Sequence, residues 1–231
     1  MTAANSSFNL RVPFGQKNGR LYMPHQVERG LACECFCPEC GSRLISNQGN
    51  HKRHYFSHHE SRECEGGYET SVHLMAKQVV EDHRYIELPV FHKILSRKLP
   101  TGDSVEEEAL VLSKRLDFAF VRQEEGLDGL KPDVIGISSD GQELLIEVYV
   151  THAVSDEKCE RYRNRNLIEL DLSQIPRDSV TNESAFCELV LSKCDRLWHS
   201  CRLYKAEIAL ARQRLNTKAR QLLTECVFRR T

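Results

Sequence analysis

A carboxylate interrupts the apolar run LLIEVYV, residues 144–150, at Glu147. Such a charge is unfavourable in a buried strand unless it is paired or holds a cation. A second carboxylate, Asp133, follows a Lys-Pro pair at the start of the preceding apolar run, and a Ser-Asp-Gly turn between the runs predicts a hairpin. Neighbouring strands would bring both carboxylates to one Mg²⁺ or Mn²⁺, ions that prefer hard oxygen ligands. Such an ion activates water and neutralises charge on a scissile phosphate.

Each carboxylate also has an ordinary structural explanation. Asp133 alone fits a turn, and Glu147 alone fits a strand position that faces solvent. Taken together, with proline before one and apolar neighbours around the other, they support a metal site as well as they support the structural alternative. Upstream, Glu69, His73 and Lys77 follow i, i+4, i+8 spacing and form one polar line on a predicted helix.

A second set of metal-ligand residue types lies within residues 33–64. Cys37 and Cys40 form a Cys-Pro-x-Cys-Gly knuckle, and His58 and Cys64 follow after 17 and 5 intervening residues. Two such pairs can close a tetrahedral site around one ion. The segment has little apolar periodicity, so it is not expected to build a hydrophobic core by itself and needs a bound metal ion to stabilise it. We expect a structural zinc, because four protein ligands leave no open position for water.

Other residues compete for places in this set. His54 and His59 are alternatives to His58 as the third ligand. Cys33 and Cys35 would share one face of a strand, but no partner pair is evident for them. The alternative to zinc is four unrelated residues in a chain rich in cysteine.

Composition and charge set the class of protein. The chain has 231 residues, of which 40% are hydrophobic and 28% charged, as in soluble globular proteins. No apolar run would span a membrane and the start lacks a secretory pattern, so we expect a cytoplasmic location, where ten cysteines favour metal ligands and buried thiols over disulfides. Residues 101–147 hold 4 basic and 12 acidic residues, a net charge of −8, and residues 201–231 hold 8 basic and 2 acidic, a net +6. The acidic segment could bind divalent cations and the basic segment could bind phosphates, although ordinary solvated surfaces explain both charges.

The order of helices and strands predicted around these residues indicates an α/β core. Apolar spacing predicts a helix over residues 69–85, several strands up to residue 150, one of them a long strand over residues 108–121, a polar helix over 156–165 and a final strand over 166–173. A helix that joins two strands of one sheet defines this class. A Lys-Asn-Gly turn within residues 8–27 predicts an earlier hairpin. We divide the chain into a β-hairpin plus zinc-binding module, a core and a basic helical extension, with the boundaries 1–66, 67–175 and 176–231.

The motifs together resemble a known family. FCPECG, HYFSHHESREC and ETSVHLMAK resemble the amino-terminal part of CoiA-like competence proteins, in which a cysteine knuckle and a histidine stretch precede a helix with Glu, His and Lys. KPDVIGIS, LLIEVYVTH and IELDLS resemble the nuclease half of those proteins, which belong to the PD-(D/E)XK superfamily. The resemblance spans about residues 8–173. It implies a mixed-sheet, restriction-endonuclease-like core that cleaves DNA phosphodiesters with Mg²⁺ or Mn²⁺.

The resemblance also implies roles for individual residues. Asp133 and Glu147 match the metal carboxylates, and Glu69 matches a helical glutamate that some members add; Cys37, Cys40, His58 and Cys64 match the zinc ligands. The departure is Tyr149, where the superfamily commonly has lysine and CoiA-like members often have glutamine. In some members the lysine moves to the following helix, where this chain has Lys158. That lysine would supply positive charge near the attacked phosphate, and Tyr149 would be a hydrogen-bonding or packing group.

Two of these assignments have equal or stronger alternatives. Lys158 lies in the polar run DEKCERYRNR and is equally well explained as a surface lysine. His152, which follows the strand, could shuttle protons, although a strand-end cap explains it better.

The carboxy-terminal segment has a helical stripe of apolar residues from Phe186 to position 208. Cys187, Cys194 and Cys201 recur every seven residues, which is more typical of a helix core than of a metal site. Trp198 is expected to anchor this helix. The arginines and lysines beyond could follow a DNA backbone, and the helices could bind a protein partner or a second copy of the chain.

We therefore expect a metal-dependent deoxyribonuclease that acts in DNA uptake, recombination or defence, with no membrane partner. One alternative is a nucleic-acid-binding module whose catalytic site has decayed, which Tyr149 would explain directly. Another is a zinc-stabilised interaction protein with no nucleic-acid partner.

Overall fold

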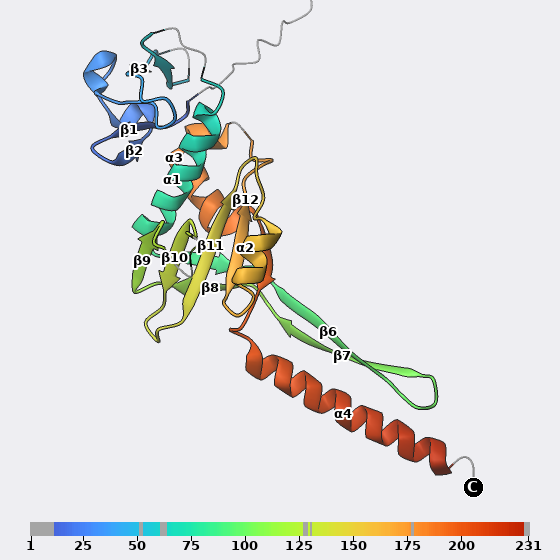
Figure 1. The fold of residues 1–231 in the computed structure, drawn as a ribbon. Coiled ribbons are helices and arrows are strands. Elements are labelled where there is room, and N and C mark those ends of the chain that lie inside the picture. Colours follow the sequence, from blue (N-terminus) through green and yellow to red (C-terminus); the bar gives the residue numbers. More distant parts are fainter. Residues whose placement is uncertain are drawn as a thin grey trace, which may run out of the picture.

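A five-stranded mixed sheet forms the centre of the molecule (Figure 1). The structure, a computed structural model, describes residues 12–50, 53–60, 64–126, 129, 131–176 and 178–228. The strands lie in the order β13-β12-β11-β10-β9, and their bounds are β9 (Phe120–Gln123), β10 (Val134–Ile137), β11 (Glu143–Tyr149), β12 (Leu167–Asp171) and β13 (Asp195–Ser200). β9, β10 and β11 are antiparallel neighbours, β11 and β12 run parallel, and β13 returns antiparallel to β12. The expected hairpin, and the expected helix that connects two strands of one sheet, are both confirmed.

Helices cover both faces of this sheet. α1 (Gly67–His83) and α3 (Glu183–Glu188) pack on one face in the main core, to which Ile146 and Val148 of β11 also belong. α2 (Asp156–Arg161) connects the parallel strands, and a smaller core with Leu145 and Tyr162 lies on its side of the sheet. Because side chains alternate along a strand, Glu147 shares the α2 side with Leu145.

The amino-terminal module has its own small core. It contains β1 (Gly15–Lys17), β2 (Arg20–Tyr22), β3 (Leu44–Asn47), β4 (Tyr55–His58) and two short 3-10 turns, Pro24–Gln26 and Leu31–Cys33. The predicted first hairpin is confirmed, with Asn18 and Gly19 at φ of 51° and 79° in its turn. Residues 8–11 of its first expected run lie outside the described residues. Cysteines dominate the buried interior, which includes Cys33, Cys35, Cys37 and Cys64.

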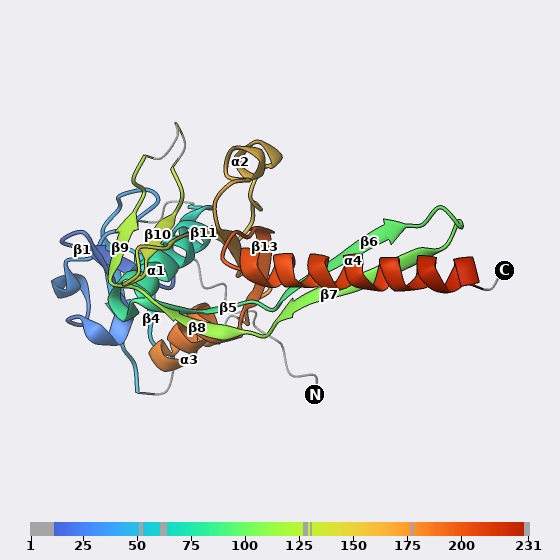
Figure 2. The ribbon, with the colours of Figure 1, turned by 90° about the horizontal axis from the view of Figure 1, so that it is seen from below.

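A ribbon and a long helix extend from the core as an arm (Figures 1 and 2). β5 (Tyr85–Leu88) pairs with β8 (Lys114–Asp117), and between them lie the paired strands β6 (Phe91–Lys98) and β7 (Ser104–Val111). α4 (Lys205–Phe228) packs on this ribbon through Ala211, Leu215 and Ala219. The arm comprises residues 90–112 and 203–228.

The carboxy-terminal segment differs from the helical stripe expected from Phe186 onward. α3 and a π-helical turn (Leu189–Lys193) stop at Cys194, and the chain then forms β13 before α4 begins. A strand at this point satisfies backbone groups along the outer edge of β12, and this pairing outweighs the local helical spacing. Trp198 does anchor the segment, but from a strand, with its indole N–H donating to the Pro89 carbonyl at 3.1 Å.

The predicted long strand over residues 108–121 is also divided. Its residues belong to β7, β8 and β9, which pair with three different partners. Residues 112–113 and 118–119 belong to no strand and separate the three strands. In the part of the chain that the structure describes, no helix combines the length and the apolar character needed to cross a bilayer.

Candidate functional site

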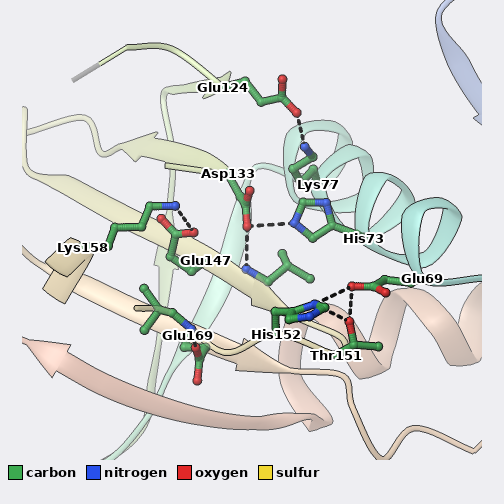
Figure 3. A network of polar contacts seen from close by, with 12 residues as sticks. Glu69, His73, Lys77, Glu124, Asp133, Glu147, Thr151, His152, Lys158 and Glu169 are labelled. Carbon is green, nitrogen blue, oxygen red and sulfur yellow. Dashed lines mark hydrogen bonds and ion pairs between the residues drawn. The ribbon is translucent and has the colours of Figure 1, made fainter. Parts of the chain in front are cut away.

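Asp133 and Glu147 meet at the end of the β10–β11 hairpin. The register pairs Val134 with Ile146, so Asp133 and Glu147 occupy the next rung. The backbone N–H of Val148 donates to Asp133 Oδ2 at 2.9 Å, which fixes that carboxylate against β11. Both side chains are largely buried, with 17% of the Asp133 side chain and 8% of the Glu147 side chain exposed. The hairpin thus places two buried carboxylates side by side, as Figure 3 shows.

Lys158 reaches this pair from α2. Its Nζ donates to Glu147 Oε2 at 2.6 Å, and its side chain is 20% exposed. The helix starts at the capping residue Ser155, whose hydroxyl accepts from the Lys158 backbone N–H at 3.3 Å. The other carboxylate oxygen, Glu147 Oε1, is buried and has no hydrogen-bond partner among the described residues. Lys158 is therefore a member of the cluster, and Glu147 retains one unsatisfied acceptor.

The two carboxylates have opposite pKa shifts. Burial, and then the charge of Asp133, raise the pKa of Glu147 to about 7, although Lys158 acts against them. Burial alone would raise the pKa of Asp133 too, but the hydrogen bond and charge of His73 and the Val148 N–H lower it below its ordinary value. Asp133 is thus the firmly charged member of the pair, and Glu147 is the carboxylate that gains most from a nearby cation.

The polar line of α1 faces the sheet near these carboxylates (Figure 3). His73 Nε2 lies 3.0 Å from Asp133 Oδ2. One turn later, Lys77, which is 1% exposed, forms an ion pair with Glu124 beyond the end of β9. One turn earlier, Glu69 accepts a hydrogen bond from Thr151 in the loop after β11. The line therefore joins α1 to β9, to Asp133 and to the segment that leads to α2.

The remaining predicted site residues lie around this cluster. Glu69 Oε1 is also 3.3 Å from His152 Nδ1, and these bonds direct its carboxylate at the loop. The pKa of Glu69 lies below its ordinary value, chiefly because Thr151 donates a hydrogen bond to it. Burial acts in the opposite direction, and His152 lowers the pKa further. The His152 side chain is 88% exposed. Tyr149 is partly buried at the end of β11, on the side of the sheet that alternation gives to Glu147.

Sequence reasoning missed a third buried carboxylate, Glu169. It lies on β12 in register with Glu147, and the tripeptide Leu-Ile-Glu occurs in both strands, at residues 145–147 and 167–169. Its side chain is 9% exposed, its Oε2 accepts from the Val154 N–H at 2.6 Å, and its Oε1 is 3.7 Å from His199 Nε2. The signal that singled out Glu147, a charge within an apolar strand, was equally present here.

A second cluster lies in the amino-terminal module. The donor atoms of Cys37, Cys40, His58 and Cys64 all lie within 4.8 Å of one another and could hold a metal ion. The Cys37 and Cys64 sulfurs are 3.8 Å apart, and Cys40 Sγ is 3.4 Å from His58 Nε2. Two thiolates on one tetrahedral zinc, with Zn–S bonds of about 2.3 Å, stand about 3.8 Å apart. The distances suit that ion.

The neighbouring candidates have other positions. His58, rather than His54 or His59, joins the cluster. Cys33 and Cys35 are buried in the module core, where the Cys33 thiol donates to the Leu44 carbonyl at 3.2 Å. The cluster also adjoins α1, because Cys64 lies three positions before Gly67, the first residue of that helix, and Glu39 of the knuckle accepts from the Thr70 hydroxyl at 2.5 Å.

The chemistry of the Asp133 and Glu147 donors is compatible with a hard divalent cation. Two adjacent carboxylates, one with a buried oxygen that has no partner among the described residues, would suffice as protein ligands for Mg²⁺, which usually keeps several waters. Comparison with protein-family models, curated proteins and solved structures found no match for this chain.

Proposed function

We propose that this protein is a metal-dependent nuclease that hydrolyses DNA phosphodiesters at the Asp133, Glu147 and Lys158 cluster. The proposal draws on the motif resemblance and on the geometry of the cluster. A magnesium or manganese ion there would neutralise phosphate charge and lower the pKa of a bound water. We assign the cysteine and histidine cluster to a structural zinc, and the substrate to DNA that takes part in uptake, recombination or defence.

The residues of this chain would divide the chemistry among them. Asp133 is held rigidly by His73 and the Val148 N–H, so its charge stays fixed in place. Glu147 would share the cation, and Lys158 would contribute a positive charge to the developing negative charge on the phosphate. His152 is exposed at the edge of the cluster and would be accessible to substrate.

The observation that carries the proposal is Glu147 Oε1. A buried carboxylate oxygen with no partner among the described residues, in a group whose pKa is raised to about 7, makes the charged form unfavourable in a site that only maintains the fold. A cation beside it would satisfy the oxygen and favour the charged form. Functional sites commonly retain groups of this kind.

The test is a nuclease assay on linear, circular and single-stranded DNA with Mg²⁺ or Mn²⁺. Glu147→Gln keeps the shape of the side chain and removes its charge, so cleavage should fall by about 100-fold or more while DNA binding persists. Glu143→Gln, at an exposed position on the same strand, is the matched control. Full cleavage by Glu147→Gln would reject the site.

The second candidate function is DNA binding without cleavage. Tyr149 at the usual lysine position favours it, as does the ion pair that already occupies Glu147 Oε2. On this alternative the purified protein would bind DNA, but it would cleave none of the DNA forms with either Mg²⁺ or Mn²⁺.

A further inference from the structure

Glu169 is buried in the sheet and has no part in the proposed chemistry. It is the neighbour of Glu147 in the parallel pair, and 9% of its side chain is exposed. A carboxylate in such a place must be compensated by strong hydrogen bonds or charges. The contacts are the Val154 N–H at 2.6 Å and, at a longer 3.7 Å, the ring of His199.

The Val154 N–H belongs to the segment that sets the start of α2. Val154 directly precedes Ser155, the N-cap residue of this helix. Lys158 lies only four residues beyond Val154, within the first turn. A charge-assisted hydrogen bond to a backbone N–H therefore fixes the chain just before the element that carries the lysine.

α2 itself has few other contacts, among them the partly buried Cys159, which packs against the smaller core. It is six residues long, and none of its own residues is buried. A helix this short is not stable by itself, so its position depends on what flanks it. Tyr162, which is fully buried, holds the carboxyl end, and the Glu169–Val154 hydrogen bond holds the amino end. The Lys158–Glu147 distance of 2.6 Å depends on both.

We propose that Glu169 is the positioning residue for Lys158, and that it acts through the Val154 N–H rather than as a cation ligand or a group that touches DNA. The inference rests on the proposed function. An error of about 1 Å in the placement of a charged group can reduce a rate by about 100-fold. Loss of the hydrogen bond should therefore reduce kcat strongly and leave KM nearly unchanged.

Two substitutions at Glu169 separate this role from a ligand role. Glu169→Gln removes the charge but keeps an oxygen that can accept from Val154, so cleavage should stay within about 3-fold of the unmodified protein. Glu169→Leu removes the acceptor and should lower kcat by about 10- to 100-fold. Equal losses in the two variants, as expected for a metal ligand, would overturn the proposal.

A double-mutant cycle tests whether Glu169 acts through Lys158. In the Lys158→Ala background, Glu169→Leu should cause no further loss, because the group that it positions is already absent. A full additional loss would show a general effect on the fold and would also overturn the proposal. If Glu169→Leu does not fold, Val154→Pro removes the donor of the same hydrogen bond, with Val154→Ala as its control.

Hydrogen exchange provides a measurement that does not depend on cleavage. The Val154 amide should be protected in the unmodified protein and in Glu169→Gln, and unprotected in Glu169→Leu. The Lys158 ammonium signal in NMR spectra should be sharp in the unmodified protein and in Glu169→Gln, and broad in Glu169→Leu. If no variant cleaves DNA but these changes occur, the positioning role stands and the nuclease proposal fails. Unchanged Val154 protection in Glu169→Leu would refute the positioning role directly.

Discussion

At the scale of single residues, the burial of Glu147 would couple binding of the proposed cation to the stability of the chain. Its pKa is about 7 in the folded chain, above the ordinary value of 4.5, so folding favours the neutral form. This contribution to stability is complete below about pH 4.5 and is lost as the pH rises through 7, where the buried group must ionise. In metal-free buffer at pH 8, Glu147→Gln should therefore be more stable than the unmodified chain, by up to about 3 kcal/mol.

Urea denaturation at pH 5 and pH 8 measures this difference. The buffer should lack Mg²⁺ and also lack chelators, which would extract a structural zinc. Added Mg²⁺ should then stabilise the unmodified protein at pH 8 and leave Glu147→Gln unchanged. Identical pH dependence in the two proteins would show that Glu147 has an ordinary pKa.

Substitutions at Lys158 and Tyr149 together test which residue supplies the positive charge near the attacked phosphate. Lys158→Ala should lower cleavage by about 100-fold, because the developing phosphate charge loses a cation. Tyr149→Phe should have a small effect, since ring packing is kept. Tyr149→Lys alone should not increase the cleavage rate. In the Lys158→Ala background, however, it should partly restore cleavage. Unimpaired cleavage by Lys158→Ala would place the required charge elsewhere.

At the scale of elements, the cysteine and histidine cluster supports the start of α1. The Glu39–Thr70 contact joins the knuckle to the first turn of this helix, one residue from Glu69. Purified protein should contain about one zinc per chain, and Cys40→Ser should lose it. Hydrogen exchange at residues 66–73 should rise in that variant. Cys201→Ser, outside the cluster, should keep both the metal and the protection of α1.

The arm helix contains two kinds of basic residue. Arg214 and Lys218 both contact Glu107 of β7, at 3.3 Å each, so they fasten α4 to the ribbon. Arg212 and Arg220 are exposed on the same helix, and Arg229 and Arg230 lie outside the described residues. The basic segment identified from sequence thus contains residues that hold the arm together.

This division makes a matched comparison of DNA binding possible. If α4 follows a DNA backbone, replacing Arg212 and Arg220 by alanine should weaken binding for all sequences and reduce the salt slope by about 2. Replacing Arg214 and Lys218 should have the smaller effect on affinity. Equal, unchanged salt slopes in both double variants would remove α4 from the DNA-binding surface.

At the scale of the whole molecule, the features predicted from sequence are those fixed by local chemistry. The Asn18-Gly19 turn, the β10–β11 hairpin and the cysteine knuckle each depend on a few adjacent residues. The contact of Lys158 with Glu147 follows from the short connection between parallel strands, although its catalytic role stays a prediction. β13 was missed because its strand character comes from pairing with β12. Glu169 has the same local signal as Glu147, a charge within an apolar strand, but its contact with the Val154 N–H could not be predicted, because a backbone donor has no side-chain signal.

The arm joins the body of the molecule in a way that makes it separable. In the β5–β8 pair, Leu88 is opposite Lys114, so the whole ribbon is an insertion between two residues that are already cross-strand neighbours. The other half of the arm begins after β13, the last strand of the sheet. A chain that ends at residue 203, with a two-residue turn in place of residues 90–113, keeps the Pro89 carbonyl that accepts from Trp198. It should therefore retain the sheet, the cluster of Asp133, Glu147 and Lys158, and the cysteine and histidine cluster. In engineering terms, the arm is a separate attachment that should be removable or exchangeable without disturbing the elements that position the two clusters.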